Sequence, residues 1–133
     1  MKILVVDDDF ASRRILGKIA FLYGEYEVAT DGQEGVETFK TSFDSREPFD
    51  LIFLDIMMPK MDGLQVLQKI RQYEEENGIL LGEGVKIIMI TALNDSSNII
   101  NSFKEGCEKY LVKPIRKQEV IDIMDDIGFP LKK

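Results

Sequence analysis

The sequence predicts an α/β fold in which helices cover both faces of a five-stranded parallel sheet. Short runs of apolar and β-branched residues alternate five times with longer stretches whose apolar residues recur at the helical period. This alternation is typical of parallel strands joined by right-handed helical crossovers. The 133 residues suit one core, and no repeat or linker interrupts the alternation, so residues 1–133 are expected to form a single domain.

The expected strands are short. The first, "KILVV" near the N-terminus, is continuous and rich in β-branched residues, which is the pattern of a buried strand. "LIFL" and "KIIMI" are further apolar runs of this kind. The expected strands cover residues 2–6, 26–30, 51–54, 86–90 and 109–112.

Helix start and stop signals lie between the strands. The first helix is expected at about 10–23 and should end at Gly24, because glycine commonly follows a last helical turn. Asp31 followed by Glu34 has the spacing of a capping box and predicts the start of the second helix. The remaining predicted caps are Asp62 with Gln65 before the third helix, residues 94–96 before the fourth, and Gly128 with Pro130 after the fifth.

The composition excludes several classes of function. The net charge is −7 without a long run of Lys or Arg, so direct contact with nucleic acid is not expected. The apolar run at the N-terminus is too short for a signal peptide or a membrane span, so no membrane association is expected. A lone cysteine, Cys107, is expected to pack as a small apolar residue and fits a cytoplasmic location. The absence of histidine excludes His-based triads and most zinc sites.

Polar residues follow four of the five expected strands. Asp7, Asp8 and Asp9 follow the first, Asp55 the third, Thr91 the fourth and Lys113 the fifth. In open α/β sheets the ligand crevice lies at the carboxyl ends of the strands. The sequence therefore predicts that these side chains share one pocket.

Each of these residues also has a simpler interpretation. Asp9 is well placed to cap the first helix, and Thr91 and Lys113 could be ordinary strand-end and surface residues. Asp55 is different, because no helix cap is due until Asp62. The coincidence at four strand ends favours a functional site.

The clustered carboxylates predict a metal ion. Two carboxylates about 4 Å apart repel by roughly 4 kcal/mol at an effective dielectric constant near 20. Such repulsion raises carboxyl pKa values unless a cation is present, and Lys113 supplies only one positive charge. Oxygen ligands with room for water suit Mg²⁺.

Four motifs resemble the receiver domain of two-component response regulators (CheY-like). They are "VVDD", "LDIMMPKMDG", "ITA" and "YLVKP", at residues 5–8, 54–63, 90–92 and 110–114. The resemblance covers nearly the whole chain and implies a flavodoxin-like strand order of 2-1-3-4-5. It also implies that no output domain is present in this chain.

The resemblance implies a role for each strand-end residue. Asp55 would accept a phosphoryl group from the phosphohistidine of a sensor histidine kinase or phosphotransfer protein, and so would be a phosphoacceptor, not an enzyme with a separate substrate. Asp55 is expected to be ionised at neutral pH and to need no base. Mg²⁺ would be held by Asp55, by Asp8 directly, by Asp7 through water and by the carbonyl of Met57. The phosphoryl oxygens would be bonded by Thr91 and Lys113.

The resemblance also implies a switch. Thr91 would move toward the phosphoryl group, and the aromatic Tyr110 would change its rotamer populations. The fourth helix, fifth strand and fifth helix would then present a changed face to an unknown downstream protein. Candidate contacts on that face are Ile99, Ile100, Lys104 and Lys109. The alternative for Tyr110 is a half-buried packing residue.

Signal lifetime in this family depends on the residues two beyond the phosphoacceptor and two beyond the threonine. These positions hold Met57 and Leu93, which are apolar and cannot orient water. Slow self-dephosphorylation is therefore expected.

Other functions are less consistent with the sequence. Dehalogenase-type phosphatases need a second Asp two residues after the nucleophile, where this chain has Met57. No glycine-rich nucleotide-binding motif follows a strand, and three aspartates would repel a flavin phosphate. A receiver that binds partners without phosphorylation and a phosphorelay intermediate remain alternatives.

The segment 73–84 is longer than the fold requires and contains an apolar run at residues 79–81. We expect this run to fold back onto neighbouring helices. The alternative is a docking patch for a partner.

Overall fold

The computed structural model describes residues 1–92 and 96–131, in which five strands alternate with five helices. The predicted caps at residues 94 and 95, and Leu93, lie outside the described residues. The elements are β1 (Lys2–Val6), α1 (Phe10–Phe21), β2 (Glu25–Ala29), α2 (Gly32–Asp44), β3 (Leu51–Asp55), α3 (Gly63–Glu76), β4 (Lys86–Thr91), α4 (Ser96–Lys104), β5 (Lys109–Val112) and α5 (Lys117–Asp126).

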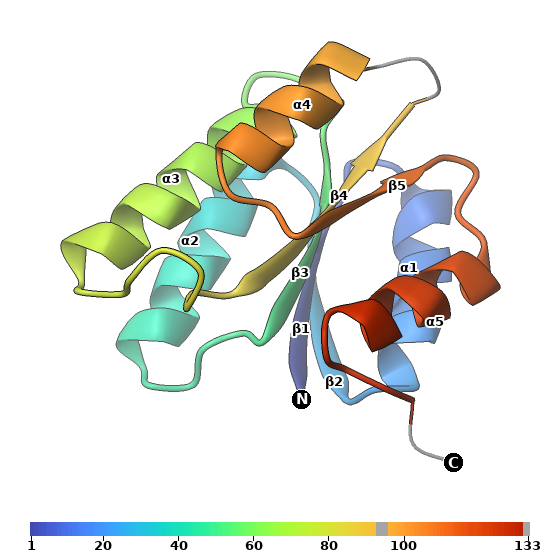
Figure 1. Ribbon diagram of the computed structural model, residues 1–133, viewed down its shortest axis with the longest axis horizontal. Helices are drawn as coiled ribbons and strands as arrows, with labels where there is room; N and C mark the ends of the chain where they lie inside the picture. Colours follow the sequence, from blue (N-terminus) through green and yellow to red (C-terminus); the bar gives the residue numbers. More distant parts are fainter. Residues whose placement is uncertain (93–95, 132–133) are drawn as a thin grey trace.

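All strand pairs are parallel and the order is β2-β1-β3-β4-β5, which confirms the predicted fold class and strand order. The register pairs Val6 with Leu54, Asp55 with Ile90, and Thr91 with Val112. The carboxyl ends of β1, β3, β4 and β5 are therefore nearly level at one edge of the sheet. The N-terminus lies at the opposite edge, at the bottom of Figure 1.

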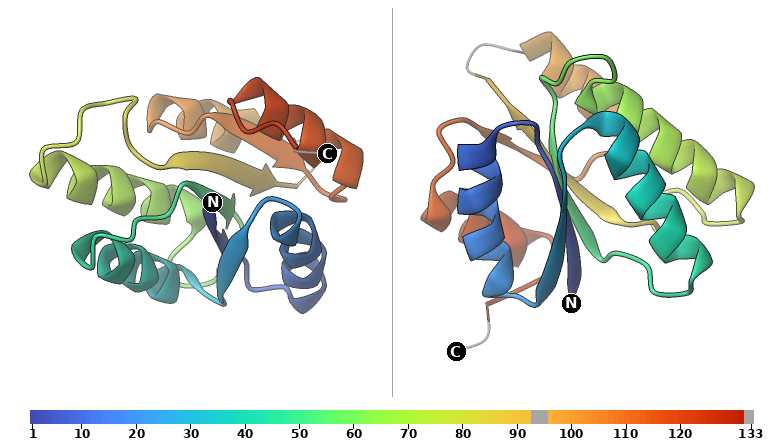
Figure 2. Two further views of the ribbon diagram at one scale, coloured as in Figure 1. Left: turned by 90° about the horizontal axis from the view of Figure 1, so that it is seen from below. Right: turned by 180° about the vertical axis from the view of Figure 1, so that it is seen from behind.

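The sheet has a core on each face because side chains alternate along the strands. Leu4 and Val6 pack toward α2 and α3, whereas Ile3 and Val5 pack toward α1 and α5. Figures 1 and 2 show α2, α3 and α4 on one side of the sheet and α1 and α5 on the other. Cys107 is buried in the first of these cores, and burial raises the pKa of its thiol to about 12, as expected for a small apolar packing residue.

The segment 73–84 differs from its prediction. Its first four residues continue α3 to Glu76, and residues 77–85 form the α3–β4 loop. Ile79 is half-buried, but Leu80 and Leu81 are 68% and 90% exposed, so the expected folding back is wrong for both leucines. Gly78 and Gly82 flank the run with φ of +82° and +88°, a left-handed conformation that turns the leucines away from the core.

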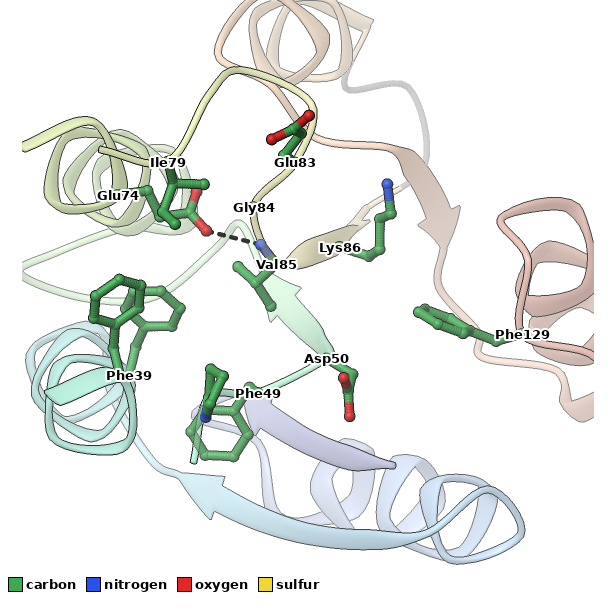
Figure 3. Close-up of a pocket in the computed structure, with 12 residues that line it drawn as sticks. Phe39, Phe49, Asp50, Glu74, Ile79, Glu83, Gly84, Val85, Lys86 and Phe129 are labelled. Carbon is green, nitrogen blue, oxygen red and sulfur yellow. Dashed lines mark hydrogen bonds between the residues drawn. The ribbon is translucent and has the colours of Figure 1, made fainter. Parts of the chain in front are cut away.

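A half-buried arginine joins α3 to the loops before β4 and β5. Arg71 donates hydrogen bonds to the carbonyl oxygens of Val85 and Gly106, at 2.8 Å and 2.7 Å. It also pairs with Glu74 at 2.7 Å and with Glu108 at 3.3 Å. Glu74 in turn accepts the N–H of Val85 at 2.7 Å, the dashed bond in Figure 3. No sequence pattern predicts this network, because Arg71 and its partners at Val85, Gly106 and Glu108 lie far apart along the chain.

Replacing Arg71 with alanine is expected to lower the free energy of unfolding by about 3 kcal/mol, because Glu74 is 5% exposed and would lose its cation. Urea unfolding measures the loss. The control is Arg116→Ala, which breaks an ion pair with Glu119 whose side chains are 71% and 50% exposed and should cost less than about 0.5 kcal/mol. Equal losses in the two variants would contradict a stabilising role for the network.

Candidate functional site

Four of the predicted site residues meet at the carboxyl edge of the sheet. Lys113 Nζ lies 3.7 Å from Asp7 Oδ2 and 3.6 Å from Asp55 Oδ2. Carboxylate oxygens of Asp7, Asp8 and Asp55 lie within 4.8 Å of one another. The prediction that side chains at the carboxyl ends of the strands share one pocket is therefore confirmed for residues up to 106 positions apart in the sequence, from Asp7 to Lys113.

The three acids differ in exposure. Asp7 and Asp55 are 0% and 2% exposed, whereas Asp8 is exposed. Asp7 Oδ1 accepts the N–H of Asp9 at 2.9 Å. Within the described ranges, Asp7 Oδ2 and Asp55 Oδ2 are buried without a hydrogen-bond partner. Two bare carboxylate oxygens in the interior are costly unless a cation or a proton compensates them.

The site raises the pKa of both buried acids. Burial is the largest cause for Asp55 and the charge of Asp7 the next, and together they raise the Asp55 pKa to about 7 against the opposing effects of Lys113 and the Met57 N–H. The pKa of Asp7 is also raised, chiefly by burial. Without a metal ion, burial and the neighbouring Asp7 thus oppose the ionisation expected for Asp55 at neutral pH, and that expectation stays a prediction for the metal-loaded site.

These residues fit a hard divalent cation. The donor set consists of carboxylate oxygens, two of them buried and without a hydrogen-bond partner among the described residues, with the exposed Asp8 on the solvent side. One ammonium group, that of Lys113, faces two buried acids and cannot neutralise both. Magnesium prefers such oxygen ligands and retains waters on an open side.

Local capping explains why the aspartates after β1 point in different directions. Asp9 accepts hydrogen bonds from the Ser12 N–H at 3.0 Å and the Ser12 hydroxyl at 2.8 Å, which caps α1 as predicted. Both hydrogen bonds lower the pKa of Asp9, and the bond from the Ser12 hydroxyl has the larger effect. Arg13 donates to the Asp7 carbonyl oxygen at 3.0 Å and so ties the start of α1 to the end of β1.

The turn after Asp55 depends on a glycine. Asp62 and Gln65 form the predicted capping box of α3, and the Gly63 N–H donates to the Ile56 carbonyl oxygen at 2.9 Å. A Cβ atom at Gly63 would lie 2.3 Å from the Asp55 carbonyl oxygen. Gly63 thus belongs to the site because of its backbone, although it has no side chain that could bind or react. In the sequence only its place in the "LDIMMPKMDG" motif indicated this role.

Gly63→Ala is expected to destabilise the fold by about 1–3 kcal/mol, because only backbone atoms could move to make room. It should also impair metal binding at Asp55, since the displaced backbone carries that residue. Chemical unfolding and Mg²⁺ titration measure the two effects. The control, Gly128→Ala, has a φ of +97° and open space around it, so it should cost about 1 kcal/mol and leave metal binding intact. An unchanged Mg²⁺ affinity in Gly63→Ala would contradict the proposed close packing.

The predicted switch residues lie on neighbouring strands. Thr91 is 0% exposed and follows Ile90, the residue paired with Asp55. Tyr110 is paired with Met89, is 38% exposed, and packs edge-on against Phe103 of α4 with ring centroids 5.9 Å apart.

The candidate contacts near the switch differ in exposure. Ile100 and Lys104 on α4 are exposed, whereas Ile99 and Lys109 are only partly so. Met57, beside Asp55, is 62% exposed.

The comparison with known proteins identifies the family. Residues 3–125 match the response regulator receiver domain. The chain belongs to this receiver family. The receiver is 40% identical over 121 residues to "Probable transcriptional regulator ycf27" of Porphyridium aerugineum, covering 90% of this chain and 44% of that protein. It is 30% identical to "Chemotaxis protein CheY" of Halobacterium salinarum, covering 95% of each chain.

A solved structure supports the same relationship. The receiver domain of the histidine kinase CKI1 from Arabidopsis thaliana, complexed with Mg²⁺, superposes with a TM-score of 0.81 at 28% identity, covering 96% of this chain and 91% of that one. The receiver spans less than half the length of the ycf27 regulators that it matches, 44% in the first. Among residues 1–92 and 96–131, no helix is long and apolar enough to cross a membrane.

Proposed function

We propose that this receiver accepts a phosphoryl group on Asp55 from a phosphohistidine and transmits the change to a protein partner. The observation that carries the proposal is the convergence of Lys113 with two buried oxygens of Asp7 and Asp55 that accept no hydrogen bond within the described residues. A site built for nucleophilic attack on phosphorus needs a free carboxylate oxygen and concentrated positive charge, more than it needs proton transfer.

In the proposed transfer an oxygen of Asp55 forms a bond to phosphorus as the bond from phosphorus to the histidine nitrogen breaks. The electron pair of that bond stays with the departing imidazole. Lys113 is held 3.6 Å from Asp55 Oδ2, within reach of a phosphoryl oxygen that replaces its present contact. The Thr91 hydroxyl, at the end of the neighbouring strand, would donate to another phosphoryl oxygen.

A metal ion fits this scheme. Asp7, Asp8, Asp55 and the carbonyl of Met57 would hold Mg²⁺, which when bound supplies positive charge against the phosphoryl oxygens and the clustered acids. The Mg²⁺ complex of the Arabidopsis receiver supports this assignment by likeness. Because a nearby cation lowers carboxyl pKa values, Asp55 would be ionised in the loaded site and need no base.

The chemistry is tested by incubating the protein with Mg²⁺ and a small acyl phosphate, followed by intact-mass measurement. The expected result is the addition of one phosphoryl group, absent from Asp55→Asn and retained in Asp126→Asn, an exposed acid on α5. Each protein molecule accepts one phosphoryl group, so further donor is used only as fast as the phosphorylated protein loses its phosphoryl group by self-dephosphorylation. Phosphorylation of Asp55→Asn at the wild-type level would overturn the assignment.

The output is proposed to use the face built by α4, β5 and α5. Ile100, Phe103 and Tyr110 are 56%, 45% and 38% exposed and form an apolar patch there. Tyr110 is proposed to change rotamer populations when Thr91 moves toward the phosphoryl group. NMR of the Tyr110 ring with and without a beryllofluoride phosphoryl mimic tests this, and identical spectra would contradict it.

Slow self-dephosphorylation remains a prediction. Met57 is 62% exposed beside the acceptor, and its apolar side chain cannot orient a water molecule. Met57→Asn is expected to shorten the acyl-phosphate half-life at least several-fold, because an amide can orient the attacking water. Phosphate release from the isolated phosphoprotein measures the half-life, and a half-life of seconds in the unaltered receiver would contradict the prediction.

A further inference from the structure

A second candidate interaction surface lies at the edge of the sheet opposite Asp55. In the left view of Figure 2 the α3–β4 loop, in yellow, lies at the periphery of the molecule beside the end of α3. Leu80 and Leu81 in this loop are 68% and 90% exposed, and no other exposed large apolar residue among those described exceeds 68%. Two adjacent leucine side chains exposed to water are unusual, because burying their apolar surface would be favourable.

The exposed leucines adjoin two hollows that share one wall. A hollow of about 460 Å³ lies between the last turns of α3 and the loop, lined by Arg71, Glu74 and Leu80 among others. A second, of about 300 Å³, lies on the other side of Ile79 and Glu74 and is floored by aromatic side chains. Figure 3 shows Phe39, Phe49 and Phe129 facing this second hollow from three different segments. Ile79 lines both hollows, so the apolar surface is continuous from the leucines to the phenylalanines.

Acidic side chains border both hollows. Glu75 is exposed beside the first hollow, and Glu83 is exposed beside the second. One lysine, Lys86, also lines the second hollow. The carboxylate of Glu74 is paired with Arg71, which leaves the carboxylates of Glu75 and Glu83 to face solvent beside the leucines.

We propose that the α3–β4 loop, with its two flanking hollows, docks a cationic amphipathic segment of a partner protein. Leucine or aromatic side chains of that segment would cover Leu80 and Leu81 and enter the hollows. Its lysines or arginines would face Glu75 and Glu83. This charge pattern excludes anionic lipid and nucleic acid as the favoured occupant, since both would be repelled.

A second copy of the chain is also disfavoured as a symmetric partner, because a two-fold contact would bring the carboxylates of Glu75 and Glu83 close to those of the other copy. The surface lies at the opposite edge of the sheet from Asp55, and the residues that line its hollows are not those of the acidic site. The inference therefore does not depend on the proposed phosphoryl transfer.

The test uses ¹⁵N-labelled full chain and three synthetic peptides. One carries leucine and lysine at amphipathic helical spacing, one replaces each lysine with glutamate, and one replaces each leucine with serine. We expect the leucine–lysine peptide alone to bind, with chemical-shift changes concentrated at residues 75–84. Raising the salt concentration should weaken this binding, because exposed charges are screened.

Matched variants assign the binding to the loop. Leu80→Ser with Leu81→Ser should weaken binding at least about tenfold, and Glu75→Gln with Glu83→Gln should weaken it several-fold and reduce its salt dependence. Phe21→Ser removes a comparably exposed apolar residue on α1 (66% exposed) and Glu105→Gln an exposed acid elsewhere, so neither should alter binding. All substituted side chains are exposed, and thermal midpoints confirm that the variants fold.

Three results would overturn the proposal. The first is shift changes centred on Asp7, Asp8 and Asp55 or on the α4–β5–α5 face. The second is equal binding by the glutamate peptide or by the double-leucine variant. The third is a leucine-dependent dimer in sedimentation, or leucine-dependent binding to phosphatidylglycerol vesicles, which would assign the surface to a second copy or to a membrane.

Discussion

Asp55→Asn is expected to stabilise the metal-free protein at pH 8 by on the order of 2 kcal/mol. The Asp55 carboxylate is 2% exposed and faces the equally buried Asp7, and burial followed by the Asp7 charge raises its pKa to about 7. At pH 8 the folded protein must therefore keep an unfavourable charge that asparagine lacks. Function and stability oppose each other here, because the oxygen proposed to accept phosphorus is the one the fold tolerates least.

The pH dependence has a definite sign. The folded pKa of Asp55 lies above its ordinary value of 3.8, so the folded state binds the proton more tightly than the unfolded state. The corresponding stability is fully present below about pH 4 and is lost as pH rises through about 7. In the Asp55→Asn variant the loss of stability due to Asp55 should be absent, which leaves the pH dependence due to Asp7, whose pKa is also raised, chiefly by burial.

Urea unfolding in EDTA at several pH values from 5 to 8 measures both quantities. The free energy of unfolding of Asp55→Asn should increase relative to that of the wild type as pH rises. Saturating Mg²⁺ should markedly stabilise only the wild type, since a ligand that binds only the folded state adds stability. Asp126→Asn serves as the control for removing one exposed charge. A variant less stable than the wild type at pH 8 in EDTA would contradict the proposed origin of the raised pKa.

The sequence predicted the elements and the meeting of the site residues because both depend on local or general rules. Alternating periods specify strands and helices, and the carboxyl ends of parallel strands must share an edge. Asp9 and the Asp62–Gln65 pair were predictable as caps, since a cap and its target N–H groups are within one turn. The order of the strands came from the family resemblance alone.

Features that depend on distant partners were not predictable. Arg71 has the helical spacing of a core residue, but its partners at Val85, Gly106 and Glu108 lie 14 to 37 positions away. The exposure of Leu80 and Leu81 depends on how the backbone of residues 78 and 82 turns. The raised pKa of Asp55 depends on burial, which the sequence does not specify residue by residue.

Asp8→Asn and Asp7→Asn are expected to separate metal binding from folding, although the two residues are adjacent. Asp8 is exposed and Asp7 is 0% exposed, and both contribute carboxylate oxygens to the cluster. Either substitution removes a charge from the proposed Mg²⁺ site and should weaken Mg²⁺ binding on the order of 100-fold. Their effects on the metal-free protein should differ, because only the Asp7 charge is buried.

Without metal, Asp8→Asn should leave stability little changed, as is usual for exposed positions. Asp7→Asn should increase stability at pH 8, because burial raises the pKa of Asp7 and asparagine can still accept the Asp9 N–H. Asp9→Asn is the matched control: it removes one charge from the same run, keeps a capping oxygen for Ser12, and should change Mg²⁺ affinity little.

Calorimetric Mg²⁺ titration and urea unfolding of the three variants give the two measurements separately. The decisive comparison is between Asp8→Asn and Asp9→Asn, since both change the charge equally at neighbouring exposed positions. If Mg²⁺ binds through defined carboxylate ligands, only the Asp8 variant loses affinity. If both variants lose affinity equally, the cluster attracts cations by its total charge alone, and the assignment of Asp8 as a ligand would be wrong.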